Sequence, residues 1–537
     1  MTLRKMLKTN LKIKLCVAWW VLLTGVLPVA AQSVQTTEIK PIKGEKWWGL
    51  VVDTDKVALP FSAPFSFGST DFSPTTYRAD MMLSNRGRYV WSSTPLMVTY
   101  DGTKLVVSTT TADGSGQGVG KPTVQKAGRS LREAYLMCCH KNFPPKATPA
   151  DRMLFSAPIY ELGGEDAILY TQQDVVEFAD MLQRRGAPKG TILLPQGWNS
   201  PTGAPTFDIE AYPNPKELID ALHKQGMKVM LTITPYVPAS GRGYRQSLRE
   251  GRLMTDRKGE PIVFESRQGY TACRTIDKAA AAELNSALKA LQADYGVDGF
   301  YFDCLDALPL FGGSRGVGGS LDAFLTAWHG AAEGLNVAVY STPTHTQLGS
   351  VASSVSPSRA YTWEALGKTL ETAIDASVLG YTRTCIAADL NFATVKGKAD
   401  QRLILRTAQV ALLLPVAIVP YAVWSVDNSE AVDRMLALRS KIGPYVLSLA
   451  EESVNTAEPI IRHLEYQFPR TGFSNCRDEY MIGNRYLVAP VISDTQGRMV
   501  RLPKGKWKDA EGRKIKGPRV IDVALKDGEV AIFEADN

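Results

Sequence analysis

The feature that most constrains the fold is an alternation of strand-like and helix-like runs between about residues 151 and 445. Short apolar runs alternate there with longer runs of helical periodicity, which is typical of β/α units around a parallel sheet. We predict strands at 153–159, 191–194, 228–233, 300–303, 337–340, 384–389 and 416–423. We expect helices at 172–185, 215–224, 279–295, 321–335, 363–379, 401–412 and 429–449. About eight such units predict a closed (β/α)8 TIM barrel, with its site at the carboxyl ends of the strands.

The chain on either side of this region has a different pattern. Residues 32–150 contain short alternating runs separated by turn residues, which predict an N-terminal β-sandwich. Short strands return near the end and predict a C-terminal β-domain at 453–537. The sequence therefore divides into a segment at 1–31, the β-sandwich, a barrel at 151–452 and the C-terminal β-domain.

The first 31 residues have the composition of a secretory signal peptide. Five Lys and Arg residues and no acid occur in this segment, an apolar run extends from Cys16 to Val29, and small residues end at Ala31. Removal of those five cations lowers the formal net charge from +7 to +2. The basic charge therefore does not indicate a nucleic acid or a membrane as partner, and we expect a secreted or periplasmic protein, cleaved near Ala31.

No metal or organic cofactor is predicted from the remaining residues. Six cysteines follow the signal segment, and their spacing does not resemble a zinc site. They are Cys138, Cys139, Cys273, Cys304, Cys385 and Cys476. We also find no further run of 18 apolar residues, so we expect no membrane span in the mature chain.

Residues 296–306 are predicted to form a buried strand that ends in a carboxylate. The aromatic run 300–302 suits a strand of a parallel sheet, and Asp303 follows it directly. An acid in this position costs free energy unless it is needed there, and barrel enzymes carry catalytic residues at this end of their strands. An Asp that caps the next turn is the alternative, and spacing alone leaves both interpretations open.

Several motifs resemble glycoside hydrolase family 31, the retaining α-glucosidases, α-xylosidases and their relatives. The segment YPNPKELIDALHKQGMKV at 212–229 is similar to the family's FPDPKAMIDELHEMGIKV. Beyond the barrel, DEYMIGN at 478–484, LVAPV at 487–491 and LPKGKW at 502–507 are very close to family motifs. The resemblance implies a carbohydrate substrate with O-glycosidic bonds. It is nearest to the branch that contains the myogenesis-regulating glycosidase, whose short Phe-Asp strand end is matched at 302–303.

The resemblance also assigns a nucleophile and shows a missing acid. The segment GFYFDCLD at 299–306 is similar to the family's GFWxDMNE, which places Asp303 at the nucleophile position. The segment TWEAL at 362–366 sets the register that places Ser358 at the acid/base position. A serine hydroxyl is too weak an acid to replace a carboxyl, and loss of that acid costs on the order of 10²–10⁴-fold in rate.

Three interpretations of this substitution remain open. Another carboxyl supplies the proton, and the candidates are Asp306, Glu364, Asp389 (the counterpart of the Asp in the family's DIGGF motif) and Asp427. Alternatively, the pocket is rebuilt for a sugar other than a terminal glucoside. In the third interpretation the protein is a catalytically impaired glycan-binding protein on the same scaffold.

Four side chains near predicted strand ends are expected to contact the substrate. Trp198 and Asn199 follow the second strand, Tyr301 lies two residues before Asp303, and Trp424 follows the strand at 416–423. Tryptophan offers a large flat face with a polar edge, which suits a sugar ring. Packing within loops is the alternative for both tryptophans.

Overall fold

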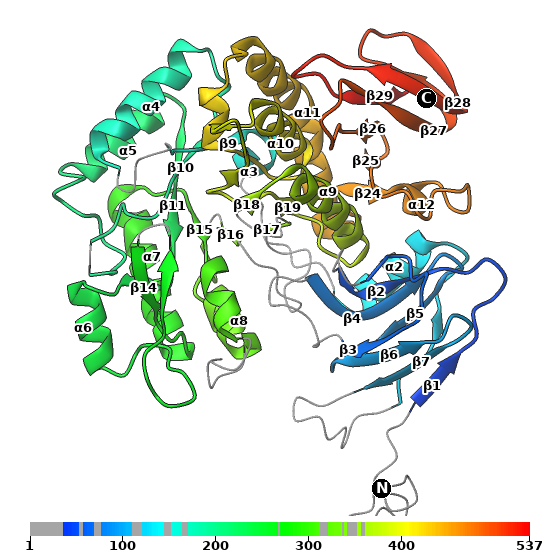
Figure 1. Cartoon of the computed structure of the whole chain (residues 1–537), viewed down its shortest axis with the longest axis horizontal. Helices are drawn as coiled ribbons and strands as arrows, with labels where there is room; N and C mark the ends of the chain where they lie inside the picture. The colour runs from blue at the N-terminus through cyan, green and yellow to red at the C-terminus, as the bar shows by residue number, and fades with distance from the viewer. Residues whose placement is uncertain are drawn as a thin grey trace, which may run out of the picture.

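The structure is a computed structural model of the chain, shown in Figure 1. It describes residues 36–52, 57–68, 77–109, 121–143, 152–163, 170–200, 202–266, 269–311, 321–335, 338–340, 352–355 and 360–536. The predicted signal peptide at 1–31 and Ser358 lie outside these residues. No helix within the described ranges is both long enough and apolar enough to cross a membrane.

An eight-stranded sheet occupies the middle of the chain, and every printed strand pair in it is parallel. Its spatial order is β19-β17-β16-β15-β11-β10-β9-β23. The strands are β9 (Pro158–Glu161), β10 (Thr191–Leu194), β11 (Lys228–Ile233), β15 (Gly299–Phe302), β16 (Ala338–Tyr340), β17 (Ala352–Ser354), β19 (Thr384–Cys385) and β23 (Ala417–Val419). The predicted β/α pattern is confirmed by this sheet and by the helices between its strands.

The structure corrects one predicted strand and adds one that the sequence did not predict. The strand expected at 153–159 is a short helix, α3 (Arg152–Ser156), followed by β9. The sixth strand, β17, was not predicted, because its sequence Ala-Ser-Ser has no apolar run and is defined by its pairing with β16 and β19. The strands expected at 384–389 and 416–423 are the seventh and eighth of the sheet, and both are shorter than predicted. β19 covers only Thr384–Cys385, and β23 covers only Ala417–Val419 and is followed by the 3₁₀ helix η2 (Tyr421–Ser425).

Most helices follow their predicted positions closely, because local signals set their ends. Two end elsewhere than predicted: α8 ends at Gly330 and not at residue 335, and α11 extends to Thr456 beyond the predicted residue 449. Thr171 caps α4 through a capping box with Asp174, and Pro215 lies in the first turn of α5. Gly296 ends α7 in a left-handed conformation at φ 83°. The helices are α4 (Gln172–Arg184), α5 (Pro215–Lys224), α7 (Lys278–Tyr295), α8 (Leu321–Gly330), α9 (Trp363–Val378), α10 (Gln401–Leu413) and α11 (Ser429–Thr456).

Between β11 and α7 the chain forms a small antiparallel unit with one helix. Its strands pair in the order β12-β14-β13. They are β12 (Tyr236–Pro238), β13 (Val263–Ser266) and β14 (Gly269–Cys273), and the helix is α6 (Arg242–Arg249). This unit covers the region where β10 and β11 end.

Two four-stranded antiparallel sheets precede the parallel sheet. Their orders are β1-β7-β6-β3 and β2-β4-β5-β8, and helix α2 (Leu131–Asn142) follows them. The strands are β1 (Thr36–Ile39), β2 (Trp47–Val52), β3 (Phe65–Gly68), β4 (Tyr77–Ser84), β5 (Arg88–Trp91), β6 (Leu96–Tyr100), β7 (Leu105–Thr109) and β8 (Gln125–Lys126). In Figure 1 these strands are drawn in blue, and β2 lies next to α9.

A six-stranded antiparallel sheet ends the chain, in the order β24-β25-β26-β29-β27-β28. The strands are β24 (Ile461–His463), β25 (Tyr480–Ile482), β26 (Tyr486–Ala489), β27 (Gly497–Lys508), β28 (Lys514–Ala524) and β29 (Ala531–Ala535), and α12 (Leu464–Gln467) follows β24. One large hydrophobic cluster joins the N-terminal sheets to the parallel sheet, and a second lies within the C-terminal sheet.

Candidate active site

Asp303 lies at the carboxyl end of β15, on the inner side of the parallel sheet. Side chains alternate along a strand, and the Phe302 ring packs outward on Trp328 of α8, with ring centroids 5.1 Å apart. Tyr301 and Asp303 therefore share the opposite face. The Asp303 side chain is buried, and its Oδ1 accepts a hydrogen bond from the Leu305 backbone N–H at 3.0 Å. The Asp303 N–H in turn donates to the Ile233 carbonyl at 2.8 Å.

Two interior side chains hold the segment that follows β19. The Ala388 N–H donates to the Tyr301 hydroxyl at 3.2 Å, and the next N–H, that of Asp389, donates to Glu161 Oε1. Asp389 adopts the left-handed conformation at φ 62°. Tyr301 lies on the strand that ends at Asp303, so the segment carrying Asp389 is attached to the same part of the site.

Glu161 is a functional candidate that the sequence reasoning missed. Its side chain is buried at 2% exposure at the carboxyl end of β9. Its second oxygen, Oε2, accepts a hydrogen bond from the Tyr421 N–H at 3.3 Å. Because the predicted strand ends at residue 159, Glu161 was not recognised from the sequence as an acid at the end of a strand. Glu161 follows a buried Ile-Tyr pair, just as Asp303 follows a buried aromatic run.

A cavity of about 360 Å³ lies between the segments that follow β10 and β11, the unit with α6, and α7. Trp198 and Asn199 line it, as does Ile233, whose carbonyl binds the Asp303 N–H. Asp303 itself is not among the lining residues. The Trp198 indole N–H donates to the Thr232 carbonyl at 2.8 Å, which holds the ring at the cavity wall.

The cavity also has charged groups in its wall. Arg252 pairs with Glu283 at 3.0 Å and with Glu250 at 3.5 Å. Arg274 donates to the carbonyls of Thr202 and Gly203 and to the Ser247 hydroxyl, and burial lowers the pKa of its guanidinium. Arg274 therefore braces the loop after β10.

The remaining predicted acids lie in different surroundings. Asp306 is half-buried in the 3₁₀ helix η1 (Leu305–Phe311), which follows Asp303. Glu364 is exposed on α9 and pairs with Lys368 at 2.7 Å. Asp427 is exposed, and its Oδ2 accepts from the Gln401 amide at 3.0 Å. Asp306 and Asp389 thus follow strand ends, whereas Glu364 and Asp427 face solvent.

Trp424 packs against the helical layer. Its ring lies 5.9 Å from the Tyr160 ring and 6.2 Å from the Phe178 ring of α4. The Arg185 guanidinium lies 5.3 Å from its centroid. The Tyr160 hydroxyl donates to the Pro188 carbonyl in the loop after α4. The ring contacts with Tyr160 and Phe178 place the Trp424 ring between β9 and α4.

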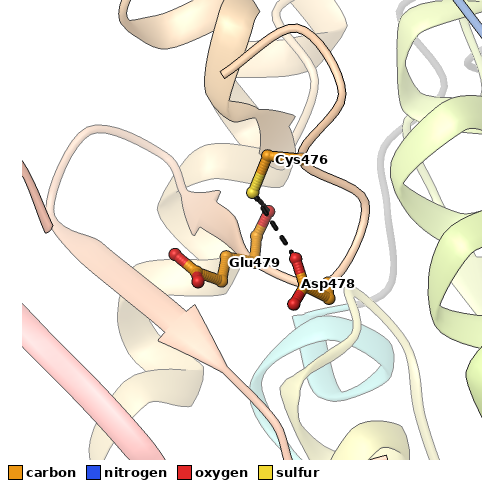
Figure 2. Close-up of side chains that lie close together, drawn as sticks. All are labelled: Cys476, Asp478 and Glu479. Carbon is orange, nitrogen blue, oxygen red and sulfur yellow. Dashed lines mark hydrogen bonds between the residues drawn. The ribbon is translucent and has the colours of Figure 1, made fainter. Parts of the chain in front are cut away.

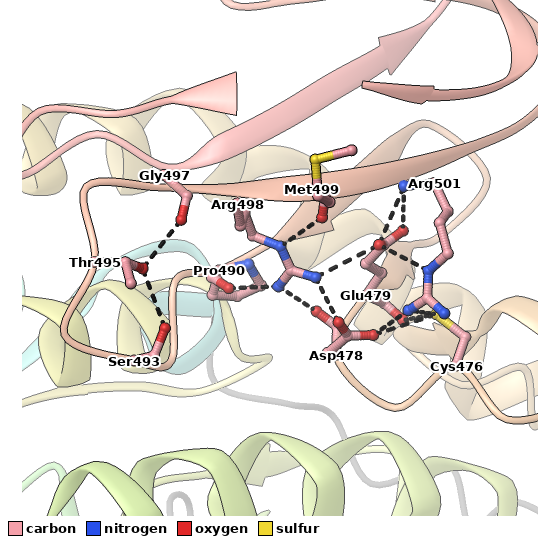
Figure 3. A network of polar contacts seen from close by, with 10 residues as sticks. All are labelled: Cys476, Asp478, Glu479, Pro490, Ser493, Thr495, Gly497, Arg498, Met499 and Arg501. Atoms are coloured by element: carbon pink, nitrogen blue, oxygen red, sulfur yellow. Dashed lines mark hydrogen bonds and ion pairs between the residues drawn. The ribbon is translucent and has the colours of Figure 1, made fainter. Parts of the chain in front are cut away.

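One group of potential metal ligands occurs within the described residues, at Cys476, Asp478 and Glu479 (Figure 2). Arginines already occupy it, as Figure 3 shows. Arg501 donates to Cys476 Sγ at 3.1 Å and to Glu479 at 3.2 Å, and Arg498 pairs with Asp478 at 2.6 Å. Burial raises the pKa of the Cys476 thiol to about 12, whereas a metal ligand must be a thiolate. This group is therefore an ion-pair network that joins β25 to β27.

The parallel sheet, the helices between its strands and the acids Glu161 and Asp303 define a β/α protein with acidic side chains at the carboxyl ends of its strands. Two family models match the chain. The Glycosyl hydrolases family 31 TIM-barrel domain matches residues 157–314, and the Glycosyl hydrolase family 31 C-terminal domain matches residues 457–534. Two parts of the chain thus match domains of glycoside hydrolase family 31, which confirms the resemblance seen in the sequence motifs.

Curated relatives and solved structures agree with this family. An alpha-glucosidase of Saccharolobus solfataricus is 24% identical over 432 residues, covering 68% of this chain and 62% of the relative. The myogenesis-regulating glycosidase of Mus musculus is 24% identical over 417 residues, covering 72% and 57%. The chain thus spans about three-fifths of the length of these relatives.

Among solved structures, a GH31 alpha-xylosidase from a soil metagenome, complexed with xylose, is similar at a TM-score of 0.73 and 18% identity. The similarity covers 93% of this chain and 79% of that one. A GH31 sulfoquinovosidase from E. rectale is similar at a TM-score of 0.74 and 16% identity, covering 94% and 82%. At these identities the similarity shows the fold alone.

Proposed function

We propose that the protein is a glycosidase that hydrolyses O-glycosidic bonds of a carbohydrate, with Asp303 as the nucleophile. The observation that carries the proposal is the buried Asp303 carboxyl at the carboxyl end of β15, in a chain that matches family 31 domains. In a retaining mechanism this carboxylate attacks the anomeric carbon and forms a glycosyl ester, while a second carboxyl protonates the leaving oxygen. Water then hydrolyses the ester.

We assign the second carboxyl to Asp389 in preference to the other acids. Asp389 follows a segment whose amides bind Tyr301 and Glu161 at the inner side of the sheet. Glu364 and Asp427 are exposed. The aromatic wall of the cavity at Trp198, with Asn199 beside it, is proposed to hold part of the carbohydrate.

We extend the proposal to the organisation of the whole chain. The N-terminal sheets form a β-sandwich within 32–150, the barrel extends over 151–452 as a closed (β/α)8 barrel, and a β-domain follows. A backbone hydrogen bond of 3.1 Å from Val416 to Thr384, next to the two edge strands, supports closure. The composition of residues 1–31 supports secretion or a periplasmic location.

A catalytically impaired glycan-binding protein is the second candidate function. Ser358 at the family's acid/base position favours it. The two functions differ in whether the Asp303 carboxylate turns over substrate or only lies beside a bound glycan.

Aryl α-glycosides with good leaving groups test the proposal, because they need little help from an acid. We expect the wild-type protein to hydrolyse at least one of them, and a fluorosugar to label Asp303, as read by mass spectrometry. Asp303→Ala should abolish both turnover and labelling, a loss on the order of 10⁴-fold or more.

Glu430→Gln is a suitable control, because Glu430 is an exposed acid on α11 that pairs only with Arg434 in the described structure. Its kinetics should match the wild type. Glycan binding without turnover or labelling, with affinity retained in Asp303→Ala, would establish the binding protein instead.

A further inference from the structure

We propose that Glu161 is a positioning residue that sets the direction of the Asp389 carboxyl; this inference rests on the proposed function of the site. Glu161 ends β9, and its two oxygens bind two separate chain segments. Oε1 accepts from the Asp389 N–H, after β19, and Oε2 accepts from the Tyr421 N–H, after β23. One buried carboxylate therefore joins three chain segments at the carboxyl end of the sheet.

The chemistry of this contact requires a carboxylate. An ionised carboxylate only accepts hydrogen bonds, whereas an amide side chain carries both an acceptor and an NH₂ donor. Both groups that face Glu161 in these contacts are backbone N–H donors. Glutamine at this position would aim its NH₂ at one of them, and that partly buried N–H would lose its Glu161 acceptor.

The backbone conformation of Asp389 requires support from its surroundings. Its φ of 62° lies in the left-handed region, which a non-glycine residue adopts at a cost and keeps only when its surroundings hold it. The Ala388 and Asp389 amides are fixed by Tyr301 and Glu161 in succession. Two fixed consecutive amides set the direction of the Cα–Cβ bond of Asp389, and so that of its carboxyl.

The second contact of Glu161, from Oε2 to the Tyr421 N–H, is also held in place by its surroundings. Gly163 packs against the Tyr421 ring so closely that a Cβ on Gly163 would overlap it. Tyr421 begins the 3₁₀ helix η2 (Tyr421–Ser425). Because β19 and β23 are the two ends of the strand order, Glu161 ties the segments beyond both edges to one carboxylate. The contact therefore aligns Asp389 relative to β9 and β23.

Hydrogen exchange tests the contact directly, in the full chain and without substrate. Glu161→Gln should raise the exchange rate of the 388–390 and 421 amides by at least tenfold, since it removes a hydrogen bond to a charged acceptor. Glu465→Gln is the matched control: Glu465 is also fully buried, and it accepts from the Arg470 N–H at 2.8 Å and from Ser474 at 2.9 Å in the C-terminal sheet region. Glu465→Gln should leave the exchange rates of the 388–390 and 421 amides unchanged. Equal exchange in wild type and Glu161→Gln would overturn the inference.

A double-mutant cycle tests the positioning role, because a purely structural role would not couple to one side chain. Glu161→Gln should lower kcat/KM about tenfold or more, and Asp389→Ala should lower it further. In the double variant Glu161→Gln should add nothing, since the carboxyl that it directs is gone. Additive losses would overturn the inference.

Two further outcomes keep this inference separate from the proposed function. If wild type hydrolyses no aryl glycoside, the proposed function fails, while the exchange comparison still decides the Glu161 contact. If Glu161→Gln does not fold, Glu161→Asp replaces it, because its side chain is one methylene shorter and cannot keep both contacts at their present lengths. Faster exchange of the Asp389 or Tyr421 amide would then support the inference, and unchanged exchange of both would overturn it.

Discussion

At the scale of single residues, Trp198 combines packing contacts with a place in the wall of the cavity. It is buried, its indole N–H donates to Thr232, and its ring lies 5.1 Å from that of Phe207. It also lines the cavity beside the strand ends. Buried tryptophans usually satisfy their indole N–H, so the hydrogen bond fixes which edge of the ring faces the cavity.

Trp198→Phe should lower stability and weaken substrate binding together. Loss of the indole hydrogen bond costs about 1 kcal/mol, and the smaller ring removes part of the cavity wall, so KM for an oligosaccharide should rise. Urea denaturation and steady-state kinetics measure the two effects. The matched control is Trp507→Phe, because Trp507 is equally buried and donates to the Pro503 carbonyl at 2.9 Å in the C-terminal sheet. It should lose similar stability at unchanged KM; an unchanged KM in both variants contradicts the proposed sugar contact.

At the scale of elements, the ends of helices could be predicted and one strand could not. Pro215 and Gly296 mark ends of α5 and α7 through their own backbone preferences. Strand β17 lacks any local preference, and its partners are brought to it by the surrounding sheet. The burial of one residue was also not predictable from local patterns. His463, the last residue of β24, is fully buried, and no pattern in the sequence indicated this.

His463 should make the protein less stable as the pH falls. It is fully buried, its Nδ1 accepts from the Glu465 N–H, and burial together with the charge of Arg477 lowers its pKa to about 3. The unfolded chain binds a proton near pH 6.5 and the folded chain does not, so stability is lost as the pH falls from about 6.5 toward 3. Between pH 7 and 5 this effect amounts to about 2 kcal/mol.

His463→Asn isolates this effect, because Asn can still accept from the Glu465 N–H but does not titrate. Chemical denaturation at pH 7 and pH 5 should show a smaller pH-dependent loss in the variant than in the wild type. The same pH dependence in both proteins would show that other groups cause it.

At the scale of the whole molecule, one buried carboxylate connects the N-terminal region to the C-terminal sheet. Glu458 binds Arg132 of α2, and the Tyr466 hydroxyl donates to it at 2.8 Å. Arg132 binds Oε1 of Glu458, whereas the Tyr466 hydroxyl and Arg462, at 3.6 Å, both contact Oε2. The Tyr135 hydroxyl of α2 donates to the Ala457 carbonyl at 3.0 Å beside it. These contacts, with the shared hydrophobic cluster, predict cooperative unfolding of the N-terminal sheets and the parallel sheet.

Glu458→Ala should destabilise the chain as a whole. Removal of one partner leaves the buried Arg462 charge uncompensated, at a cost of up to about 3 kcal/mol after allowing for the half-exposed Arg132. Circular dichroism and tryptophan fluorescence should report one coincident transition at lower urea. Glu451→Ala, which breaks only an exposed pair with Arg152 at 3.7 Å, should change stability by less than about 0.5 kcal/mol. Two separated transitions in the wild type would contradict this prediction.

The sequence by itself determined the alternation of strands and helices, the family resemblance, and the placement of Asp303 after a buried strand, because hydrophobic periodicity and motifs are properties of neighbouring residues. Only the tertiary structure decided which side chains contact the chain segments around Asp303. The Glu161 carboxylate binds the Asp389 and Tyr421 amides, which are more than 200 residues away along the chain. No local pattern encodes such a contact, since it exists only when the sheet brings β9, β19 and β23 to one end.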